Sequence, residues 1–417
     1  MKLFTFGGAS VKDATAVENV ARIIKQHQNE KLIVVVSAMG KTTDLLETLV
    51  RAYFYRKEEK WTIFNRFKKF HTEICDKLFA GEIIPDAILS FFAELELKLI
   101  KFPSLNYNFE YDQIVSIGEL VSTRIVSEYL NSAGIKNQWV DVRNCIRTDD
   151  VFRDASIDWG LTEEFSQEVY NFKSHDLYIT QGFIGSTSMS LTTTLGREGS
   201  DFSAAILGNV LNAEDVTFWK DVPGVLSADP KKSIDAKQIN ALSYREAVEI
   251  THSGAKVIHP KTMKPLHNKK IPLFVKSFLE PDIGGTVIEE IDSRIDLPPI
   301  FILKENLVLI TLSPKDFSFI SIEDIERIVN FMLEHRVKVT LMQQSAIDLN
   351  LVIDAPDSNL KEIFDELTIF YSIRYNTDLT LITIRHYTEE NLDKIVKEKD
   401  IYLEQHSRLT ARMLVKS

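Results

Sequence analysis

The apolar run Leu32–Val36 most constrains the fold, because all five residues are aliphatic and four are β-branched. A run without polar alternation predicts a strand buried on both faces, as in a parallel sheet covered by helices. A second run, Lys2–Phe6, ends at two glycines, and Asp13 then caps a predicted helix that extends to about Gln26. Strand, loop, helix and strand in this order predict the opening of a parallel α/β sheet.

Later segments extend the same pattern. A charged helical elaboration is expected over 56–102, a helix over 118–133 and strands over 138–142, 177–180 and 215–219. The last two strands end in polar or glycine-bearing loops, which is where ligands bind in open α/β sheets.

The 417 residues are too many for one compact core, so two or three domains are expected. Residues 1–280 are predicted to form the ligand-binding α/β domain, and 281–300, which contain Gly284-Gly285 and Pro298-Pro299, to form a linker. From 301 to 417 the spacing is shorter. Strands over 307–312, 337–342, 348–353 and 379–385, two closing strands, and helices over 322–335, 360–370 and 388–398 predict two small α+β units.

Composition excludes several classes of function. A formal net charge of −11 argues against broad binding to nucleic acid or anionic membranes, which needs clustered Lys and Arg. The only two cysteines, Cys75 and Cys145, form no metal or redox motif, and no apolar run has signal-peptide or transmembrane length. A cytoplasmic protein is therefore expected.

The segment Thr-Thr-Thr-Leu-Gly-Arg-Glu-Gly-Ser-Asp over 192–201 is the strongest candidate for chemistry. Gly196 and Gly199 bracket a tight loop, and Ser200 or Asp201 is expected to cap a helix over 202–211. A helix N-terminus attracts anions, and Arg197 adds a planar fork for a carboxylate or phosphate. An ordinary capped helix is the alternative.

Three further segments are weaker candidates: the glycines at 7–8, the loop after 215–219 and the segment 254–260. Each has a plain surface turn or a solvated lysine as its alternative. Adjacent glycines at 7–8 allow close approach of the backbone to a phosphate. The tail Gly40-Lys41-Thr42 is not a P-loop, because the partner glycine would fall at Val35. The loop after 215–219 and the segment 254–260 place Lys220, Asp221, Lys231 and Lys256 near turns.

These motifs together resemble the aspartokinases, of the amino-acid kinase superfamily. The family's Lys-Phe-Gly-Gly-Thr-Ser-Val is similar to Phe6–Val11, with Ala9 for Thr, and its Gly-Glu pair to Gly118-Glu119. Ile-Thr-Gln-Gly-Phe-Ile-Gly matches 179–185, and the 192–201 segment differs from the family only at Glu198. Trp-Thr-Asp-Val-Pro-Gly matches 219–224 with Lys220 for Thr, and Gly-Ala-Lys-Val-x-His-Pro matches 254–260.

The resemblance implies a three-layer αβα kinase domain followed by two ferredoxin-like ACT domains. It implies transfer of the γ-phosphoryl group of ATP, with Mg²⁺ held mainly by ATP oxygens and water, to the β-carboxylate of L-aspartate. By resemblance, the aspartate pocket would comprise Ser37, Ala38, Thr43, Glu119, Arg197 and Ser200, with Arg197 on the α-carboxylate and Glu119 on the ammonium. Gly8, Asp201 and Lys256 would serve catalysis, and Gly7, Gly8, Ala9, Lys220, Asp221, Lys231 and Lys256 the nucleotide. A structural alternative for Glu119 is that it stabilises a helix start.

Thr5 is the main departure, because the family has a lysine immediately before Phe-Gly-Gly that reaches the transferred phosphate. Loss of such a charge costs about 2–4 kcal/mol of transition-state stabilisation. Lys2, Lys12 and Lys41 are candidates to compensate, although Lys2 faces the opposite side of a regular strand. An impaired enzyme, an inactive regulatory relative and a kinase of another small acid are therefore the alternatives to an active aspartokinase.

The last region resembles paired ACT domains, which in the family bind lysine or threonine at a dimer interface. A homodimer is therefore implied. Residues 313–319 and 342–346 occupy the effector-contact region, where Ala346 replaces an expected acid, and the second lobe stops without the family's terminal helix.

Overall fold

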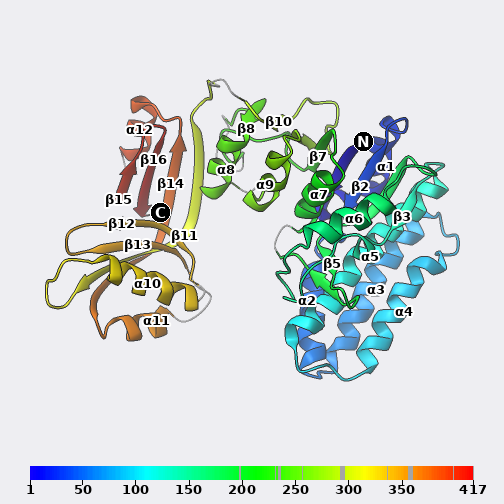
Figure 1. Cartoon of the computed structure of the whole chain (residues 1–417), viewed down its shortest axis with the longest axis horizontal. Helices are drawn as coiled ribbons and strands as arrows, with labels where there is room; N and C mark the ends of the chain where they lie inside the picture. Colours follow the sequence, from blue (N-terminus) through cyan, green and yellow to red (C-terminus); the bar gives the residue numbers. More distant parts are fainter. Residues whose placement is uncertain are drawn as a thin grey trace. The chain divides into compact units, whose positions relative to one another are not determined.

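The computed structural model describes residues 1–196, 199–230, 232, 236–255, 257–291, 296–335, 337–355, 360–397 and 399–416. The chain divides into two compact units (Figure 1). Unit 1 comprises residues 1–226, 238–251 and 256–295, and unit 2 comprises 227–237, 252–255 and 296–417.

Unit 1 is built on an eight-stranded sheet in the order β3-β4-β2-β1-β7-β9-β10-β8. All neighbouring pairs are parallel except β9 with β10, which explains the buried apolar runs of the first strands. The strands β5 and β6, which lie between β4 and β7 in the chain, form a separate two-stranded antiparallel sheet. The strands are β1 (Lys2–Phe6), β2 (Leu32–Val36), β3 (Gln138–Val140), β4 (Leu177–Gln181), β5 (Ile184–Ser186), β6 (Thr192–Thr194), β7 (Asp215–Lys220), β8 (Ala241–Ser243), β9 (Leu273–Ser277) and β10 (Thr286–Glu289).

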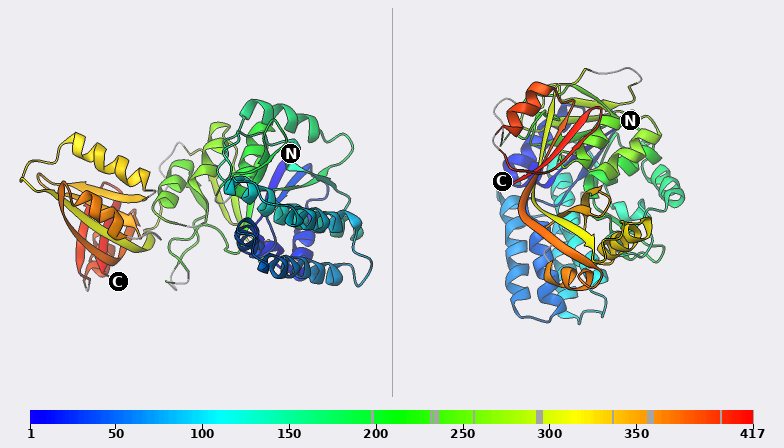
Figure 2. Two further views of the ribbon diagram at one scale, coloured as in Figure 1. Left: turned by 90° about the horizontal axis from the view of Figure 1, so that it is seen from below. Right: turned by 90° about the vertical axis from the view of Figure 1, so that its left-hand side faces the viewer.

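Helices cover both faces of this sheet (Figure 2). The helices of unit 1 are α1 (Ala14–Gln26), α2 (Thr42–Phe54), α3 (Glu59–Leu78), α4 (Asp86–Ile100), α5 (Tyr107–Ser132), α6 (Trp159–Val169), α7 (Gly199–Val210), α8 (Tyr244–His252) and α9 (Pro260–Asn268), with 3₁₀ turns η1 (Gly8–Val11) and η2 (Val142–Asn144). Asp13 caps α1 as expected, accepting a hydrogen bond from the Ala16 N–H.

α1 and α7 lie on opposite faces of the sheet. The Phe4 ring packs edge-on against His27, at the end of α1. Phe4 pairs with Thr217 of β7, so these two side chains point to the same face. The preceding residue, Val216, points to the other face, and it is there that Gly208 of α7 lies against it. Because the chain leaves β1 for β2 on one side while β7 lies on the other, the strand order reverses between β1 and β7. Such a switch point opens a crevice at the carboxyl ends of the strands.

Unit 2 holds a six-stranded antiparallel sheet in the order β12-β13-β11-β14-β16-β15 (Figure 1). The long strands β11 (Ile300–Pro314) and β14 (Tyr371–Arg385) run through two α+β lobes, with register shifts between Lys304 and Leu309. The other elements are α10 (Ile322–Glu334), β12 (Val339–Gln344), β13 (Leu349–Asp354), α11 (Leu360–Leu367), α12 (Glu389–Val396), β15 (Ile401–His406) and β16 (Thr410–Lys416). Separate apolar clusters that include Ile310 and Met413 form the cores of the two lobes.

The expected linker contains structure that its composition did not predict. Within residues 281–300, strand β10 pairs with both β8 and β9, and Ile300 begins β11. β14 begins well before the expected strand over 379–385, and α5 begins at Tyr107 rather than near Gly118.

In the described part of the chain, no helix is long and apolar enough to span a membrane. Cys75 and Cys145 are both buried free thiols, and burial raises the pKa of each to about 12.

Candidate active site

Four loops meet at one edge of the unit 1 sheet, because β4, β2, β1 and β7 are neighbouring parallel strands. Gly7, Gly8 and Ala9 follow β1, while Ser37 and Ala38 follow β2. Lys220 ends β7 and Asp221 follows it. The structure therefore brings seven of the predicted residues to the carboxyl edge, beside the switch point between β1 and β7.

The glycine loop after β1 is packed directly on the loop after β2. The Gly40 N–H donates to the Gly8 carbonyl at 3.0 Å, and the Ser37 N–H donates to the Phe6 carbonyl at 3.0 Å. A Cβ on Gly8 would lie 2.8 Å from the carbonyl oxygens of both Ala38 and Gly40. At Gly7 nothing would lie within 4 Å of a Cβ, so this glycine keeps open the approach to its backbone.

Glu119 lies beneath the loop after β2. It is in the middle of α5 and only 3% exposed, and its Oε2 atom is buried without a hydrogen-bond partner in the protein. Burial raises the pKa of Glu119 well above its usual value, although a hydrogen bond from the Ala38 backbone lowers it. The mid-helix position removes the alternative that this carboxylate stabilises a helix start. A buried acceptor without a hydrogen-bond partner in the protein fits a cationic ligand group.

α5 is joined to the same loop by two further contacts. The Ser122 hydroxyl donates to the Ser37 carbonyl at 2.6 Å. A Cβ on Gly118 would lie 2.9 Å from Leu46 and 3.3 Å from the Ala38 side chain, so the glycine permits this close packing. Thr43 is half-buried in the first turn of α2, which follows this loop in the chain.

The start of α7 is packed on the loop after β4. A Cβ on Gly182 would lie 2.4 Å from the Ser200 Cα, and the Phe183 N–H donates to the Ser203 hydroxyl at 3.0 Å. α7 begins at Gly199, so the expectation that Ser200 or Asp201 caps this helix is wrong. Both residues lie inside its first turn, where backbone N–H groups have no partner within the helix.

Lys220 and Asp201 form an ion pair that the sequence did not reveal. The Lys220 Nζ lies 2.5 Å from the Asp201 Oδ2, and the two side chains are 24% and 7% exposed. The pair joins the last residue of β7 to the first turn of α7. It therefore places a lysine ammonium beside a helix N-terminus at the crevice.

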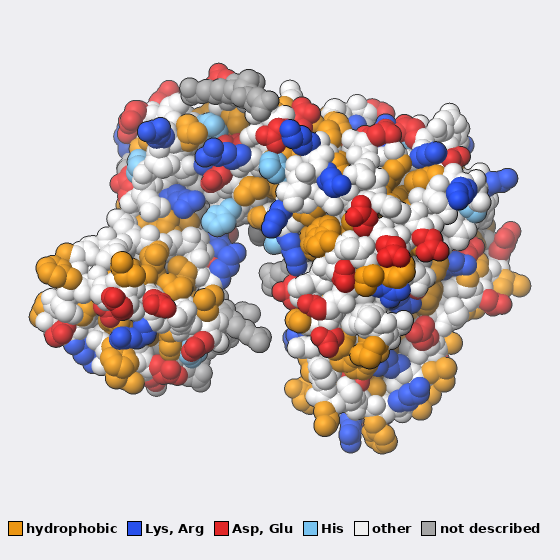
Figure 3. Space-filling view, viewed as in Figure 1, with side chains coloured by type: hydrophobic (Ala, Val, Ile, Leu, Met, Phe, Trp, Pro, Cys, Tyr) orange, Lys and Arg blue, Asp and Glu red, His pale blue; other side chains and the backbone are white. Residues whose placement is uncertain are grey.

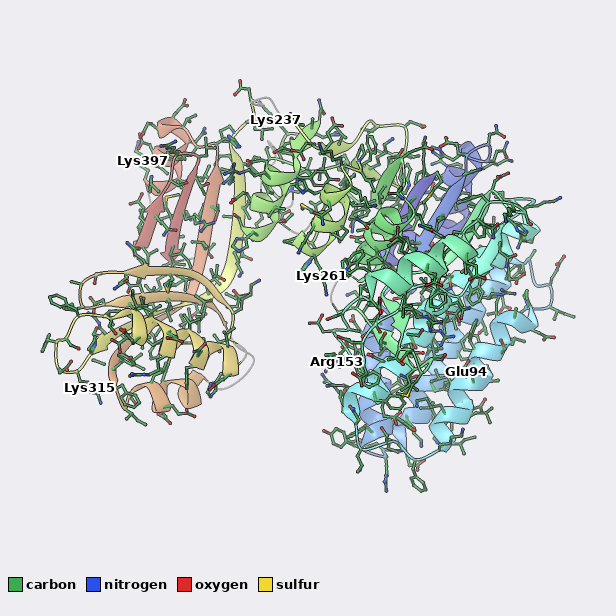
Figure 4. The ribbon with its side chains drawn as sticks, viewed as in Figure 1. Glu94, Arg153, Lys237, Lys261, Lys315 and Lys397 are labelled. Atoms are coloured by element: carbon green, nitrogen blue, oxygen red, sulfur yellow. The ribbon has the colours of Figure 1, made fainter. Side chains whose placement is uncertain are left out.

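Asp112 ties α5 to the 192–196 segment. Its carboxylate accepts from the Thr194 N–H and hydroxyl and from the Arg153 N–H, while burial raises its pKa to about 6. Nearby, the Lys261 ammonium donates to the Leu195 carbonyl and contacts Asp154 at 3.2 Å. Arg153 and Lys261 lie along the same side of unit 1 (Figure 4).

Three predicted residues, Arg197, Lys231 and Lys256, lie outside the described residues. Asp221 is exposed beyond β7. Among the described residues, no group of three or more His, Cys, Asp and Glu side chains is arranged to hold a metal ion. On the face drawn in Figure 3, Lys and Arg side chains are interspersed with Asp and Glu.

A cavity of about 370 Å³ lies between α2, α5 and the loop that carries Arg153. Of the predicted site residues that the structure describes, none lines it. Its lining comprises Glu47, Arg51, Tyr55, Tyr107, Tyr111 and Arg153.

The fold and the phosphate-compatible edge define the class of protein. The model of the amino acid kinase family matches residues 3–277. The lysine-sensitive aspartokinase 3 of Escherichia coli is 33% identical over 362 residues, which cover 85% of this chain and 78% of that protein. The chain therefore belongs to the aspartokinases of the amino acid kinase family.

Solved structures agree with this assignment over the whole chain. E. coli aspartokinase III in complex with lysine and aspartate gives a TM-score of 0.85 at 28% identity, covering 100% of this chain and 96% of that one. The same enzyme with aspartate and ADP gives 0.84 at 27% identity and the same coverage. The expected α/β kinase fold followed by ACT-type α+β lobes is thereby confirmed.

Proposed function

We propose that the chain transfers the γ-phosphoryl group of ATP to the β-carboxylate of L-aspartate, giving 4-phospho-L-aspartate for amino-acid biosynthesis. The observation that carries this proposal is the buried, unpartnered Glu119 Oε2 beside the glycine loops. A buried carboxylate suits the substrate ammonium, and open loop N–H groups suit phosphate oxygens.

The remaining aspartate contacts follow the family resemblance. Arg197 would hold the α-carboxylate, and Ser37, Ala38, Thr43 and Ser200 would complete the pocket. A shared pocket is supported because Ser37 and Ala38, which follow β2, contact α5 beside Glu119, at Ser122 and Gly118 respectively. Bound in this way, aspartate would present its β-carboxylate to the loop edge.

The nucleotide would lie along the loops after β1 and β7. Gly7, Gly8 and Ala9 would cradle phosphates, while Lys220, Asp221, Lys231 and Lys256 would contact the nucleotide. The reaction needs no general base, because the carboxylate is already a nucleophile. A bond forms from its oxygen to the γ-phosphorus as the bond to the β–γ bridging oxygen breaks, and that electron pair leaves on ADP. Mg²⁺ would be carried in on ATP oxygens and water, as is usual for this ion, and would neutralise phosphate charge.

The ACT lobes are proposed to form a homodimer and to bind lysine or threonine. Phe317 and Phe319, between β11 and α10, and Ile322, the first residue of α10, are strongly exposed, and such apolar patches mark interaction sites. The two expected effector segments also lie close together, since the N–H of Ile320, the residue directly after the first segment, donates to the Ala346 carbonyl at 3.1 Å. A cytoplasmic location remains a prediction from the sequence.

The test is formation of aspartyl hydroxamate from MgATP, L-aspartate and hydroxylamine by the purified chain. The wild type should form product with L-aspartate and at least ten-fold less with L-glutamate. Glu119→Gln is the matched variant, since it keeps the shape of the side chain and removes its charge. Equal activity with both amino acids, or equal activity of this variant, would contradict the substrate assignment.

The second candidate function is a regulatory relative without turnover, which Thr5 favours. Aspartate binding without hydroxamate formation would support it.

A further inference from the structure

Thr5 cannot supply the positive charge that the family places before the glycine loop. It lies in β1, between Val35 of β2 and Phe218 of β7, and is 1% exposed. Its hydroxyl is buried without a hydrogen-bond partner. The central strand therefore offers no cation at this position.

Lys220 lies on the same face of the neighbouring strand. Thr5 pairs with Phe218 across the parallel β1–β7 ladder, so the two side chains point to one face of the sheet. Lys220 follows Phe218 by two residues and points to that face as well. As the last residue of β7, Lys220 lies at the carboxyl edge of the sheet. The side chain of a lysine at position 5 would have to extend along β1 to reach the same edge.

The ion pair with Asp201 holds the Lys220 ammonium at the start of α7. An ammonium carries three N–H donors, so one cation can bridge a carboxylate and a phosphate oxygen. The first-turn N–H groups of α7 add partial positive charge at the same place. The local charge therefore favours an anion, even though Asp201 is itself negative.

The other lysines considered from the sequence are less suitable. Lys2 points to the opposite face from Thr5 and forms an ion pair with Glu30 at 2.6 Å. Lys12 and Lys41 are exposed on their loops. Neither is joined by a salt bridge among the described residues to the start of α7.

We propose that Lys220 is the catalytic residue that contacts the transferred γ-phosphoryl group in this chain, in place of the lysine absent at position 5. The proposal rests on the proposed kinase function and gives Lys220 a specific role within it. Asp201 then acts as a positioning residue that holds the ammonium over the crevice between β1 and β7.

Four variants test it in the hydroxamate assay. Lys220→Met should lower kcat by about 10²–10³-fold, as expected for loss of a charge that stabilises the transition state. Lys220→Arg should retain activity within ten-fold of wild type. The double variant Thr5→Lys/Lys220→Thr should regain at least ten-fold over Lys220→Met, whereas Thr5→Lys alone should change kcat less than three-fold.

Lys276→Met is the matched control. Lys276 lies on β9 opposite Trp219 and therefore points to the other face of the sheet. Its loss should change kcat less than two-fold. A kcat for Lys220→Met within three-fold of wild type, or a gain above ten-fold in Thr5→Lys, would overturn the proposal.

Nucleotide titration separates this inference from the substrate assignment. By calorimetry, Lys220→Met should weaken the binding of a non-hydrolysable MgATP analogue at least ten-fold and that of MgADP less than three-fold. Equal weakening of both would overturn the role at the γ-phosphoryl group. If wild type gave no hydroxamate, the proposed function would fail, and the ratio of these two affinities would still decide the role of Lys220.

Discussion

Glu119→Gln should change aspartate binding and protein stability in opposite directions, because both depend on the charge of one buried carboxylate. The carboxylate is 3% exposed and has one oxygen without a partner, so a bound ammonium would be its main electrostatic partner. Removing one member of a buried charged pair costs about 2–5 kcal/mol. A loss of about 3 kcal/mol corresponds to roughly 150-fold weaker aspartate binding. The KM for ATP should change less than three-fold.

The stability effect has the opposite sign. Because burial raises the pKa of Glu119 above the usual 4.5, the folded protein keeps a proton that the unfolded chain releases. The contribution of Glu119 to the stability of the wild type is fully present below pH 4.5 and declines by about 1.4 kcal/mol per pH unit until the raised pKa is reached. The glutamine variant lacks this decline.

Thermal melts between pH 5 and pH 8 should therefore diverge. The Tm of the variant should exceed that of wild type increasingly as pH rises, by about 2 °C for each kcal/mol. Aspartate binding to wild type should also release a proton, measurable by calorimetry in buffers of different ionisation enthalpy. A Tm difference that stays constant across this pH range would refute the raised pKa, and an unchanged aspartate KM would refute the pocket.

Two further predictions concern the β1 strand and its loop. Thr5→Val removes a buried hydroxyl without a partner, so the Tm should rise by about 2 °C, with kcat unchanged; a fall in Tm would show that this hydroxyl is satisfied in solution. Gly8→Ala should destabilise the protein by about 1–3 kcal/mol, because its Cβ would meet the Ala38 and Gly40 carbonyls. Gly7→Ala is its control: it should melt within 1 °C of wild type (roughly the ±0.5 kcal/mol of a substitution without contacts) and still weaken ATP binding, and equal melting of the two variants would contradict the packing described.

Strand positions near the start of the chain were predictable because their apolar runs are continuous. β1 and β2 have the predicted bounds, and α1 begins after the predicted cap. β10 was not predicted, since its four residues lie between glycines and acidic residues and gain their stability from β8 and β9. The exposed first half of β14 likewise owes its strand conformation to pairing with β11.

In the candidate site too, some features could be predicted from local sequence and others depend on tertiary packing. Glycine loops and the Gly118-Glu119 pair could be recognised as local motifs. The Lys220–Asp201 ion pair could not, because it depends on how β7 and α7 pack. The close approach of Gly182 to Ser200 is also set by tertiary packing, although the glycine itself was part of a matched motif.

The shared strands of unit 2 have a consequence for how this unit folds. Ile300, at the start of β11, pairs with Arg385, at the end of β14, while the first lobe is formed by the chain between them. The second lobe therefore cannot complete its sheet until that intervening chain has become compact. Pairing across such long sequence separations slows folding, because the entropy of loop closure is lost before the contacts form. During synthesis unit 2 would therefore fold in a fixed order: the first lobe, formed by the chain between Ile300 and Arg385, would fold before the second lobe completes its sheet.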